Sequence, residues 1–554
     1  MAPRRSALQN AVPQSALPGQ GGFIQPWPKQ DKYPNREGTD MKEKATGTFT
    51  VGNIVKVAGT RYGDREAIYC ATTGKRLSFR EVNRRVNRLA NGLLSQGMKK
   101  GDVCAFLSFN RAEIVEIYFA LAKIGALGIP LNYRLAPPEI VELVNFCGAE
   151  NFIFDPTFTE TVTAMKAQMP GVRRYFCMGD SIPAFASSYE ALIASSPETE
   201  PDVDVREEDP QYLNLTSGTT GLPKAYLLTQ YNNAAAGPIM AFMHGLSAAD
   251  TVLTVFPIFG RVGFAWSAMS LFAGARNVIH QFDLTKMLEL IQNEKVTISN
   301  WVPTIASFVL SLPDLDKYDF SSLRALVFAA SPFLPSLQAE VKKRLCPRIY
   351  EYYGLQESGV LVNIGPEDKD RKPESVGTLY PGADVRIVDA NGKDVPNGEV
   401  GEIIGRGVAV TTGYYRNEEK TREMFRDGWF YTGDLGRFDE DGFLYLSGRK
   451  KDMIISGGQN VFAVEVEETI TSHGAVMQCA VIGLPDDTWG ESVTAVVVKI
   501  PGKEATEQEI IDYCRDKIAH FKSPKKVYFA DSLPMTATGK VQKFLLVEKY
   551  SVKP

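Results

Sequence analysis

The stretch Thr216-Ser-Gly-Thr-Thr-Gly-Leu-Pro-Lys224 follows the apolar sequence Tyr212-Leu-Asn-Leu. Gly218 and Gly221 allow the backbone to turn with its N–H groups pointing inward, and Lys224 adds a positive charge. The hydroxyl groups of this stretch add further hydrogen-bond donors; they belong to Thr216, Ser217, Thr219 and Thr220. Such a Gly/Thr/Ser cluster also fits a plain surface turn. The full nine-residue string instead predicts a loop that wraps a polyphosphate, although it lacks the Gly-Lys-Ser/Thr ending of a Walker A loop.

Length and charge exclude several classes of protein. The chain has 554 residues, and its 61 Lys and Arg against 65 Asp and Glu give a net charge of −4. No basic face for a nucleic-acid backbone is expected from this balance. The longest apolar-leaning stretch, residues 262–275, is too short for a membrane span, and no apolar segment follows Arg4 and Arg5. We therefore expect a cytoplasmic protein without a membrane span.

The cysteines and histidines argue against disulfide and metal chemistry. Seven cysteines lie far apart in the sequence, without a Cys-x-x-Cys pair, which favours a reduced chain. None of the four histidines lies at metal-ligand spacing from another His or Cys. Zinc chemistry and a His-based catalytic triad are therefore poorly supported.

Hydrophobic periodicity predicts an α/β protein with a small α+β domain at its C-terminus. Residues 1–46 have no sustained period and are expected to form a flexible extension. A capping box at Ser78 and Glu81 predicts a helix that ends at Gly97, followed by a strand over 103–107 and a helix over 112–124. Near the end, strands are expected at 480–483 and 492–500, and a helix over 507–520.

A stretch dense in Gly, Asp, Lys and Arg, residues 433–458, is where we expect the joint between domains. We divide the chain into the extension 1–46, a large domain 47–450 and a mobile domain 451–554.

Further motifs follow the loop in a fixed order. They are Tyr352-Tyr-Gly-Leu-Gln-Glu357, Val376-Gly-Thr-Leu-Tyr-Pro-Gly382, Gly428-Trp-Phe-Tyr-Thr-Gly-Asp434, Asp441-Gly-Phe-Leu-Tyr-Leu-Ser-Gly-Arg-Lys-Lys-Asp-Met-Ile454 and Leu533-Pro-Met-Thr-Ala-Thr-Gly-Lys540. With these motifs the chain resembles, from about residue 47 to 548, the adenylate-forming superfamily of acyl-CoA synthetases, aryl-CoA ligases, luciferases and peptide-synthetase adenylation domains.

The resemblance implies an ATP site that converts a carboxylic acid into acyl-AMP. Lys540 resembles the lysine that bridges the α-phosphate and the carboxylate, and Glu357 resembles the Mg²⁺ ligand. Gln356 stands where a Thr is usual, and its amide can donate to a phosphate oxygen. Asp434 resembles the acceptor of the ribose hydroxyls, and Arg449 resembles the second ribose or phosphate contact. The adenine slot would be formed by Ala330, Ser331, Pro332 and Tyr353, and Gly354 is a further predicted ATP-binding residue.

The same resemblance places a hinge at Lys451, about which the C-terminal domain rotates between two half-reactions. Gly457 and Gly458 would admit the pantetheine arm of CoA, although the same glycines also fit a hairpin turn, and Lys522 would meet its phosphates. The acyl pocket would be formed by Phe259, Gly260, Trp266, Ala329 and Tyr352. The two bulky rings of Trp266 and Tyr352 favour a short, cyclic or aromatic acid over a long fatty chain.

The chain departs from the family pattern at several positions. Ala225-Tyr226 stands where Gly-Val is usual, Gln230 where His is common, and Ala463 where Pro is frequent. Gly260 replaces a His that often gates the acyl or pantetheine tunnel, next to Arg261. This change either opens the tunnel or lets Arg261 meet a polar acid.

Together these observations predict a carboxylic acid:CoA ligase that uses ATP, Mg²⁺ and coenzyme A. Two alternatives stay open: the same adenylation with an amine or a carrier-protein thiol as acceptor, and an inactive scaffold that binds a ligand. A luciferase-like oxidation is less well supported, and the C-terminal Ser-Val-Lys-Pro is not a peroxisomal address. Expected partners are the small-molecule acid, ATP and CoA, with no nucleic acid, and a homodimer is left open.

Overall fold

A computed structural model describes residues 49–216, 224–486, 488–535 and 541–551. These residues all belong to one compact unit, 47–554. The predicted extension 1–46 lies outside the described residues.

A first sheet contains seven strands in the order β7-β6-β5-β3-β4-β8-β9. All neighbours are parallel except the hairpin β8–β9. The expected strand 103–107 is confirmed as β3, whose residues are mostly buried, as in a parallel sheet covered on both faces. The strands are β3 (Val103–Leu107), β4 (Leu127–Leu131), β5 (Asn151–Phe154), β6 (Arg174–Cys177), β7 (Ser187–Ser188), β8 (Pro210–Thr216) and β9 (Lys224–Thr229).

A second sheet contains nine strands in the order β16-β15-β14-β13-β12-β10-β11-β1-β2. Its inner strands are parallel, and antiparallel strands close both edges. The strands are β1 (Glu66–Cys70), β2 (Lys75–Ser78), β10 (Thr251–Thr254), β11 (Arg276–Ile279), β12 (Ile298–Trp301), β13 (Ala325–Phe328), β14 (Ile349–Leu355), β15 (Gly359–Ile364) and β16 (Thr378–Leu379).

A third, antiparallel sheet follows in sequence, with the order β17-β18-β20-β19 and with β21 paired to β20. Its strands are β17 (Ala383–Val388), β18 (Gly401–Gly407), β19 (Phe425–Arg426), β20 (Trp429–Phe438) and β21 (Leu444–Arg449). Much of the stretch 433–458 that we expected to be a joint therefore forms regular strands.

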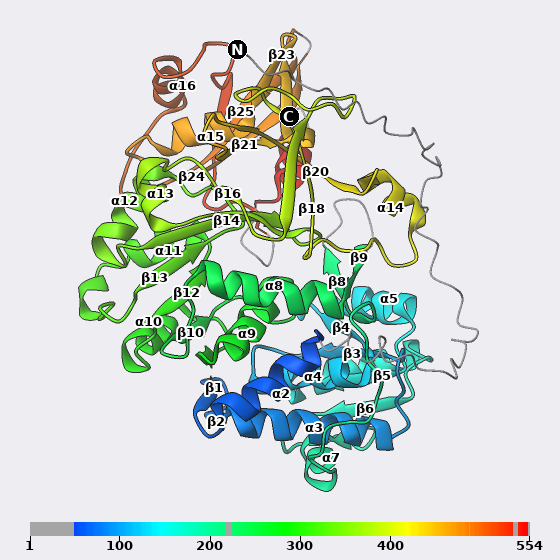
Figure 1. Ribbon diagram of the computed structural model, residues 1–554. Coiled ribbons are helices and arrows are strands. Elements are labelled where there is room, and N and C mark those ends of the chain that lie inside the picture. The colour runs from blue at the N-terminus through cyan, green and yellow to red at the C-terminus, as the bar shows by residue number, and fades with distance from the viewer. Residues whose placement is uncertain (1–48, 217–223, 487, 536–540, 552–554) are drawn as a thin grey trace, which may run out of the picture. The chain divides into compact units, whose positions relative to one another are not determined.

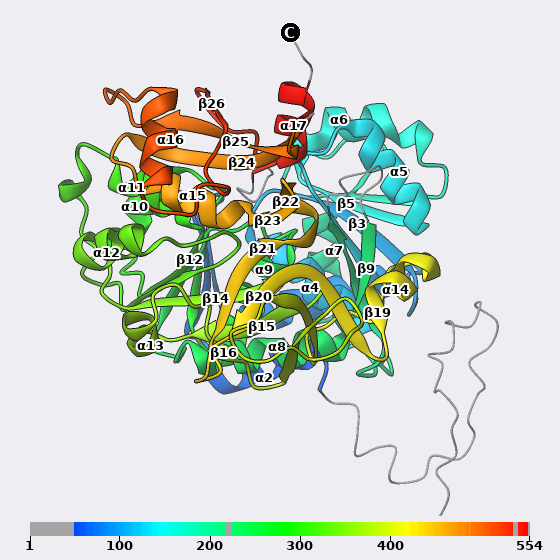
Figure 2. The ribbon, with the colours of Figure 1, turned by 90° about the horizontal axis from the view of Figure 1, so that it is seen from above.

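The C-terminal sheet has the order β23-β22-β25-β24, with β26 paired to β25, and helices cover both of its faces (Figure 2). Val481, Val493 and Val497 pack with α15 and α16, whereas the alternating Ile482 and Val496 pack with α17. The elements are β22 (Met453–Ser456), β23 (Gln459–Phe462), β24 (Val476–Asp486), β25 (Gly490–Lys499), β26 (Lys526–Phe529), α15 (Ala463–Thr471), α16 (Glu507–Arg515) and α17 (Lys543–Ser551).

Helix α16 corrects one prediction. We expected a helix over 507–520, but it ends at Arg515. The next residues form a turn in which the N–H groups of Lys517 and Ile518 both donate to the Cys514 carbonyl. The apolar spacing continues past the helix end because Ile518 still packs against the core.

The remaining helices pack against the two large sheets, and α8 and α9 run side by side (Figure 1). The capping box of Ser78 and Glu81 is confirmed at the start of α3, and the helix expected over 112–124 is confirmed as α4. These helices are α2 (Val51–Tyr62), α3 (Phe79–Ser95), α4 (Ala112–Ile124), α5 (Pro137–Cys147), α6 (Thr159–Met165), α7 (Tyr189–Ser195), α8 (Gln230–Met243), α9 (Arg261–Ala273), α10 (Leu284–Asn293), α11 (Pro303–Leu310), α12 (Pro335–Arg344), α13 (Pro366–Arg371) and α14 (Glu418–Met424). Among the described residues, none of the helices is long and apolar enough to cross a membrane.

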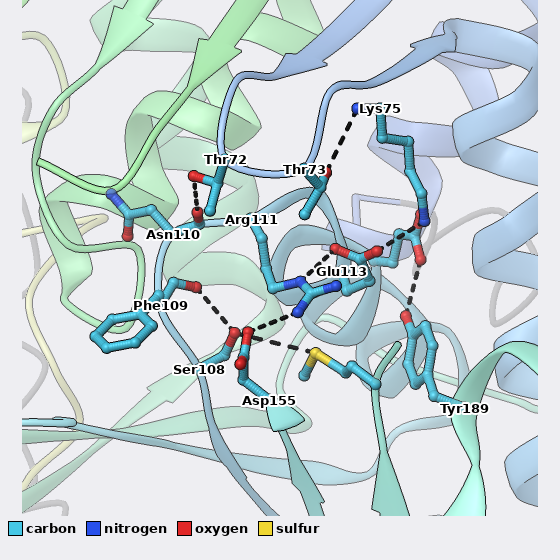
Figure 3. A network of polar contacts seen from close by, with 12 residues as sticks. Thr72, Thr73, Lys75, Ser108, Phe109, Asn110, Arg111, Glu113, Asp155 and Tyr189 are labelled. Atoms are coloured by element: carbon cyan, nitrogen blue, oxygen red, sulfur yellow. Dashed lines mark hydrogen bonds and ion pairs between the residues drawn. The ribbon is translucent and has the colours of Figure 1, made fainter. Parts of the chain in front are cut away.

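A buried ion network lies where β3 and β5 end (Figure 3). The Arg111 guanidinium donates to Glu113 Oε2 at 2.8 Å and to Asp155 Oδ2 at 2.6 Å. Lys75 Nζ lies 2.7 Å from Glu113 Oε1. Burial would raise the pKa of Glu113, but Arg111 and Lys75 outweigh it and lower the pKa to about 2.

A second part of the network joins three helices. Arg85 on α3 pairs with Glu116 on α4 at 2.6 Å and with Glu190 on α7 at 2.8 Å. The Tyr189 hydroxyl donates to Glu116 Oε2 at 2.8 Å. We refer to Lys75, Arg85, Arg111, Glu113, Glu116, Asp155, Tyr189 and Glu190 as the ion network.

Candidate active site

The predicted phosphate loop connects the two strands of the β8–β9 hairpin, which closes with Thr216 opposite Lys224. Ser217, Gly218, Thr219, Thr220 and Gly221 lie outside the described residues, as does Lys540. Their roles, and those of the Thr216 and Lys224 side chains, stay predictions.

Gln356 and Glu357 lie in the turn between β14 and β15. Tyr414 donates its hydroxyl to Glu357 Oε1 at 3.0 Å, and the Thr411 N–H donates to the Glu357 carbonyl at 2.8 Å. Tyr414 thus engages one oxygen of the Glu357 carboxylate, and no hydrogen bond to the other oxygen occurs among the described residues, which fits the predicted Mg²⁺ role. No group of three or more His, Cys, Asp or Glu able to hold a metal occurs in the described ranges. A single carboxylate suits Mg²⁺ that is bound mainly through substrate phosphates.

The Gln356 side chain connects this turn to the hairpin of the phosphate loop. Gln356 Oε1 accepts from Asn214 Nδ2 at 3.0 Å and from the Tyr226 hydroxyl at 3.4 Å. Asn214 also donates to the Tyr226 hydroxyl. Because the Gln356 oxygen is engaged in this way, its N–H groups are the part of the amide that could meet a phosphate.

Arg261 lies at the start of α9, and its side chain is buried. Its guanidinium donates to the Gln356 carbonyl at 2.6 Å and to the Ala409 carbonyl. No carboxylate within the described ranges forms an ion pair with it. Of the two sequence alternatives for Arg261, the structure therefore favours neither: the guanidinium braces the backbone of the Gln356 turn.

The predicted ribose contacts form one connected group. Asp434 on β20 lies opposite Arg449 on β21, and Arg449 Nε lies 3.0 Å from Asp434 Oδ1. The Tyr353 hydroxyl donates to Asp434 Oδ2 at 2.8 Å. Burial raises the pKa of Tyr353, and the negative charge of Asp434 raises it further. Tyr353 thus remains a neutral donor that orients the carboxylate.

The residues predicted to contact adenine lie in two places: 330–332 follow strand β13, and Tyr353 lies near the end of β14. Ala330, which precedes Ser331 and Pro332, has φ +78°, a left-handed conformation that is uncommon for a residue with a side chain. Such strained backbone is concentrated at binding sites. A Cβ at Gly354 would lie 1.8 Å from the Gly359 carbonyl oxygen, so only glycine fits where β14 and β15 come together.

The predicted acyl-pocket residues separate into two groups. Trp266, Ala329 and Tyr352 belong to one hydrophobic cluster. Phe259, in contrast, packs edge-on against Tyr133 at 5.3 Å, and Gly260 caps the N-terminus of α9. Tyr352 and Tyr353 are adjacent on β14, yet they belong to different clusters, because side chains alternate along a strand.

The predicted hinge and CoA residues lie in the C-terminal part. Lys451 is exposed in a single 3-10 turn, η4 (Lys450–Asp452), between β21 and β22. Gly457 and Gly458 form the turn of the β22–β23 hairpin, with φ +59° and +77°. Lys522 Nζ lies 2.6 Å from Glu465 Oε1, so a CoA phosphate would compete with this carboxylate.

The sequence did not point to Asn214 and Tyr414, which contact Gln356 and Glu357. Tyr226 and Gln356 depart from the family pattern, and Arg261 follows such a departure at Gly260, but the sequence alone does not connect these three positions. The structure brings these three together, since Tyr226 and Arg261 both contact Gln356. Gln230, a fourth such position, is structural: it accepts from the Val51 N–H at 3.0 Å and donates to the Ala122 carbonyl at 3.1 Å.

Comparisons with known proteins show what this chain is similar to. The chain matches the family described as AMP-binding enzyme over residues 55–415, and the AMP-binding enzyme C-terminal domain over residues 465–540. It is 35% identical to an indoleacetate–CoA ligase of Aromatoleum aromaticum, over 84% of this chain and 92% of that protein. It is 33% identical to the long-chain-fatty-acid–CoA ligase FadD13 of Mycobacterium tuberculosis, over 87% of this chain and 94% of that protein.

Among solved structures, the ATP-bound MatB from Rhodopseudomonas palustris is similar, with a TM-score of 0.82 and 30% identity, over 90% of this chain and 99% of that chain. With its large N-terminal domain and small C-terminal domain, this chain therefore belongs to the AMP-binding enzyme family and has the adenylate-forming fold.

Proposed function

We propose that the protein activates a carboxylic acid with ATP and then transfers the acyl group to CoA. In the first step the acid's carboxylate oxygen attacks the α-phosphorus of ATP, and the bond to pyrophosphate breaks. In the second step the CoA thiol loses its proton and attacks the acyl carbon, a C–S bond forms, and AMP leaves. Acyl-AMP is needed between the two because a free carboxylate is a poor acyl donor.

One observation carries this proposal: two polar groups converge at the end of β14. Tyr353 on this strand is bonded to Asp434, and Glu357 directly after it is held by Tyr414. The first group suits the ribose hydroxyls of a nucleotide, and the second suits a cation beside its phosphates. Mg²⁺, when bound there with ATP, would supply positive charge to the phosphates, and Glu357 would be its protein ligand.

The other roles follow from the resemblance and from local geometry. Lys540 would bring positive charge to both anions in the first step. The domain beyond Lys451 would then rotate, so that the Gly457–Gly458 turn and Lys522 meet CoA. The seven free cysteines suit a reducing, cytoplasmic setting.

An amine or a carrier-protein thiol is the second candidate acceptor. The observation that favours it is Gly260, which places no side chain where relatives often carry a gating ring. A homodimer stays an expectation.

Variants of two lysines test the proposal by separating the half-reactions. We expect Lys540→Ala to lower acid-dependent pyrophosphate release at least roughly 100-fold, while transfer to CoA from supplied acyl-AMP continues. We expect Lys451→Pro to leave pyrophosphate release nearly intact and to abolish the transfer of the acyl group to CoA. Lys549→Ala, an exposed lysine on α17, is the matched control and should change neither rate. Equal loss of both steps in Lys451→Pro would contradict the hinge, and acyl-AMP that accumulates without thioester would favour the second acceptor.

A further inference from the structure

Four aromatic side chains meet between helices α8 and α9 and the second sheet. His244 directly follows α8, Trp266 is on α9, and Tyr350 and Tyr352 are on β14. The His244 ring stacks on Trp266 with centroids 5.6 Å apart, and it lies 5.4 Å from the Tyr350 ring and 6.4 Å from the Tyr352 ring. Trp266, Tyr350 and Tyr352 belong to the same hydrophobic cluster as Ala329, where the acid is expected, whereas the predicted nucleotide residue Tyr353 belongs to another cluster.

Although Asn363 lies near the His244 ring and Tyr352 lies near Trp266 and Asn300, several polar atoms in this cluster form no hydrogen bond of good geometry with the described residues. They are both ring nitrogens of His244, Nε1 of Trp266, Oδ1 of Asn300 and the hydroxyl of Tyr380. The four residues that carry these atoms, His244, Trp266, Asn300 and Tyr380, are each at most 2% exposed. Buried polar atoms are nearly always hydrogen-bonded, because desolvation without a partner destabilises the fold. Several such atoms in one place therefore indicate a missing partner molecule.

The remaining buried tryptophan of this sheet region offers a contrast. Trp301 is fully buried on β12, and its indole N–H donates to Ser299 Oγ at 3.0 Å. A buried indole N–H in this protein can thus be satisfied by its neighbours. The unpartnered N–H of Trp266 is a property of its site.

Protonation fixes which kinds of hydrogen bond the cluster offers. Burial lowers the pKa of His244 to about 4, although the Asn363 side chain opposes this shift. The imidazole is therefore neutral near pH 7 and offers one donor and one acceptor. Trp266 adds a donor and Asn300 adds an acceptor. Burial raises the pKa of the Tyr352 hydroxyl, and the neighbouring side chains of Trp266 and Asn300 offset only part of this rise.

We infer that this cluster is the distal end of the acid site and selects a cyclic carboxylic acid whose ring carries a group that both donates and accepts hydrogen bonds. A ring hydroxyl can both donate and accept hydrogen bonds, whereas a ring N–H can only donate to the acceptors of the cluster. The inference rests on the proposed function, since it assigns the substrate class of the same site. An aliphatic tail would leave all of these polar atoms unpaired, so the cluster also works against a fatty acid.

Matched pairs of acids test the inference with the full chain. The two members of each pair are similar in shape and differ mainly in one polar group: phenylacetate with 4-hydroxyphenylacetate, and 1-naphthaleneacetate with indole-3-acetate. Decanoate and hexadecanoate represent fatty acids. We expect the polar member of at least one pair to exceed its apolar partner by about tenfold or more in kcat/KM for pyrophosphate release. Preference for the apolar members, or for either fatty acid, would overturn the inference.

Two tryptophan variants locate the preference in this cluster. Trp266→Phe should bring the polar-to-apolar ratio close to one, mainly by raising KM for the polar acid. Trp301→Phe removes the same atoms from a satisfied tryptophan and should leave the ratio unchanged. Tyr352→Phe, which loses only a hydroxyl, gives a second reading and should also lower the ratio. An unchanged ratio in both Trp266→Phe and Tyr352→Phe would mean that the cluster holds only water, and would overturn the inference.

The failure of this inference is distinguishable from failure of the proposed function. Pyrophosphate release with fatty acids alone leaves the proposed function standing and rejects the ring-selective cluster. No release with any of the six acids contradicts both.

Discussion

Two buried polar regions of this protein differ in whether their polar atoms have hydrogen-bond or ion-pair partners. In the ion network, each carboxylate has a cation within 3.1 Å, and the Tyr189 hydroxyl donates to Glu116. In the cluster around His244 and Trp266, several polar atoms have no partner among the described residues. The network joins helices and strand ends and contributes to the fold, whereas the cluster is left incomplete until a ligand enters. The difference teaches that the state of its hydrogen bonds, more than burial, separates a structural polar group from a binding one.

The largest expected effect comes from breaking the network at Arg111. Arg111→Met leaves Glu113 and Asp155 buried without their shared cation, so we expect unfolding to become easier by about 3 to 5 kcal/mol. Denaturant unfolding measures this change. The control is Arg173→Ala, whose exposed pair with Glu150 spans 3.7 Å and should cost at most about 1 kcal/mol. Similar costs for the two variants would remove the distinction between a buried network and a surface pair.

Arg261 differs from both regions: it is a buried charge whose hydrogen-bond partners are backbone carbonyls and not carboxylates. Arg261→Met should free the turn that carries Gln356 and Glu357 and lower the rate of pyrophosphate release by about 10- to 100-fold. Arg261→Lys keeps the charge but not the two-branched donor, and should recover only part of the rate. Stopped-time assays at saturating ATP measure this. A normal kcat with only a raised KM for the acid would instead place Arg261 in the acid pocket.

His244 makes the cluster sensitive to acid. Its pKa of about 4 in the folded protein lies below the unfolded value near 6.5, so the unfolded chain binds more protons and stability falls as pH drops from 7 toward 4. Between pH 7 and pH 5 this histidine should account for a loss of about 2 kcal/mol. Glu113, with its pKa near 2, loses its contribution only at lower pH.

His244→Gln should therefore reduce the pH dependence of unfolding over this interval. The comparison needs urea unfolding of both proteins at pH 7 and pH 5. Identical pH dependence in the two proteins would show that His244 is not buried in the neutral form.

The smallest expected effect is the difference in stability between the variants Trp301→Phe and Trp266→Phe. Trp301→Phe and Trp266→Phe lose similar volume, but only Trp301→Phe loses a hydrogen bond and leaves Ser299 Oγ without its donor. We expect Trp301→Phe to be the more destabilising by about 1 to 2 kcal/mol. Equal destabilisation would mean that Trp266 has a partner in solution, and would weaken the contrast between the regions.

Local signals in the sequence predicted much of the fold. The capping box of Ser78 and Glu81 and the spacing of apolar residues gave α3, β3 and α4, because neighbours along the chain decide helix starts and buried faces. The same kind of signal failed at the end of α16, where Ile518 keeps the apolar spacing although the helix has ended.

The site was less accessible to such reasoning. The resemblance supplied Glu357, Tyr353, Asp434 and Arg449, and the structure brings the last three into one hydrogen-bonded group. Residue type could not distinguish Trp266 from Trp301, because their partners come from strands and helices distant in sequence. Nor could it show that Tyr226, Arg261 and Gln356 meet, since each looks like a separate departure until the chain is folded.

The most direct test of the account is the mass of the product formed from ATP, Mg²⁺, CoA and a mixture of fatty, cyclic and aromatic acids. We predict one dominant acyl-CoA, derived from a ring acid with a polar substituent, together with equal amounts of AMP and pyrophosphate. ATP binding without pyrophosphate release from any acid would contradict the account and identify the protein as a binding scaffold.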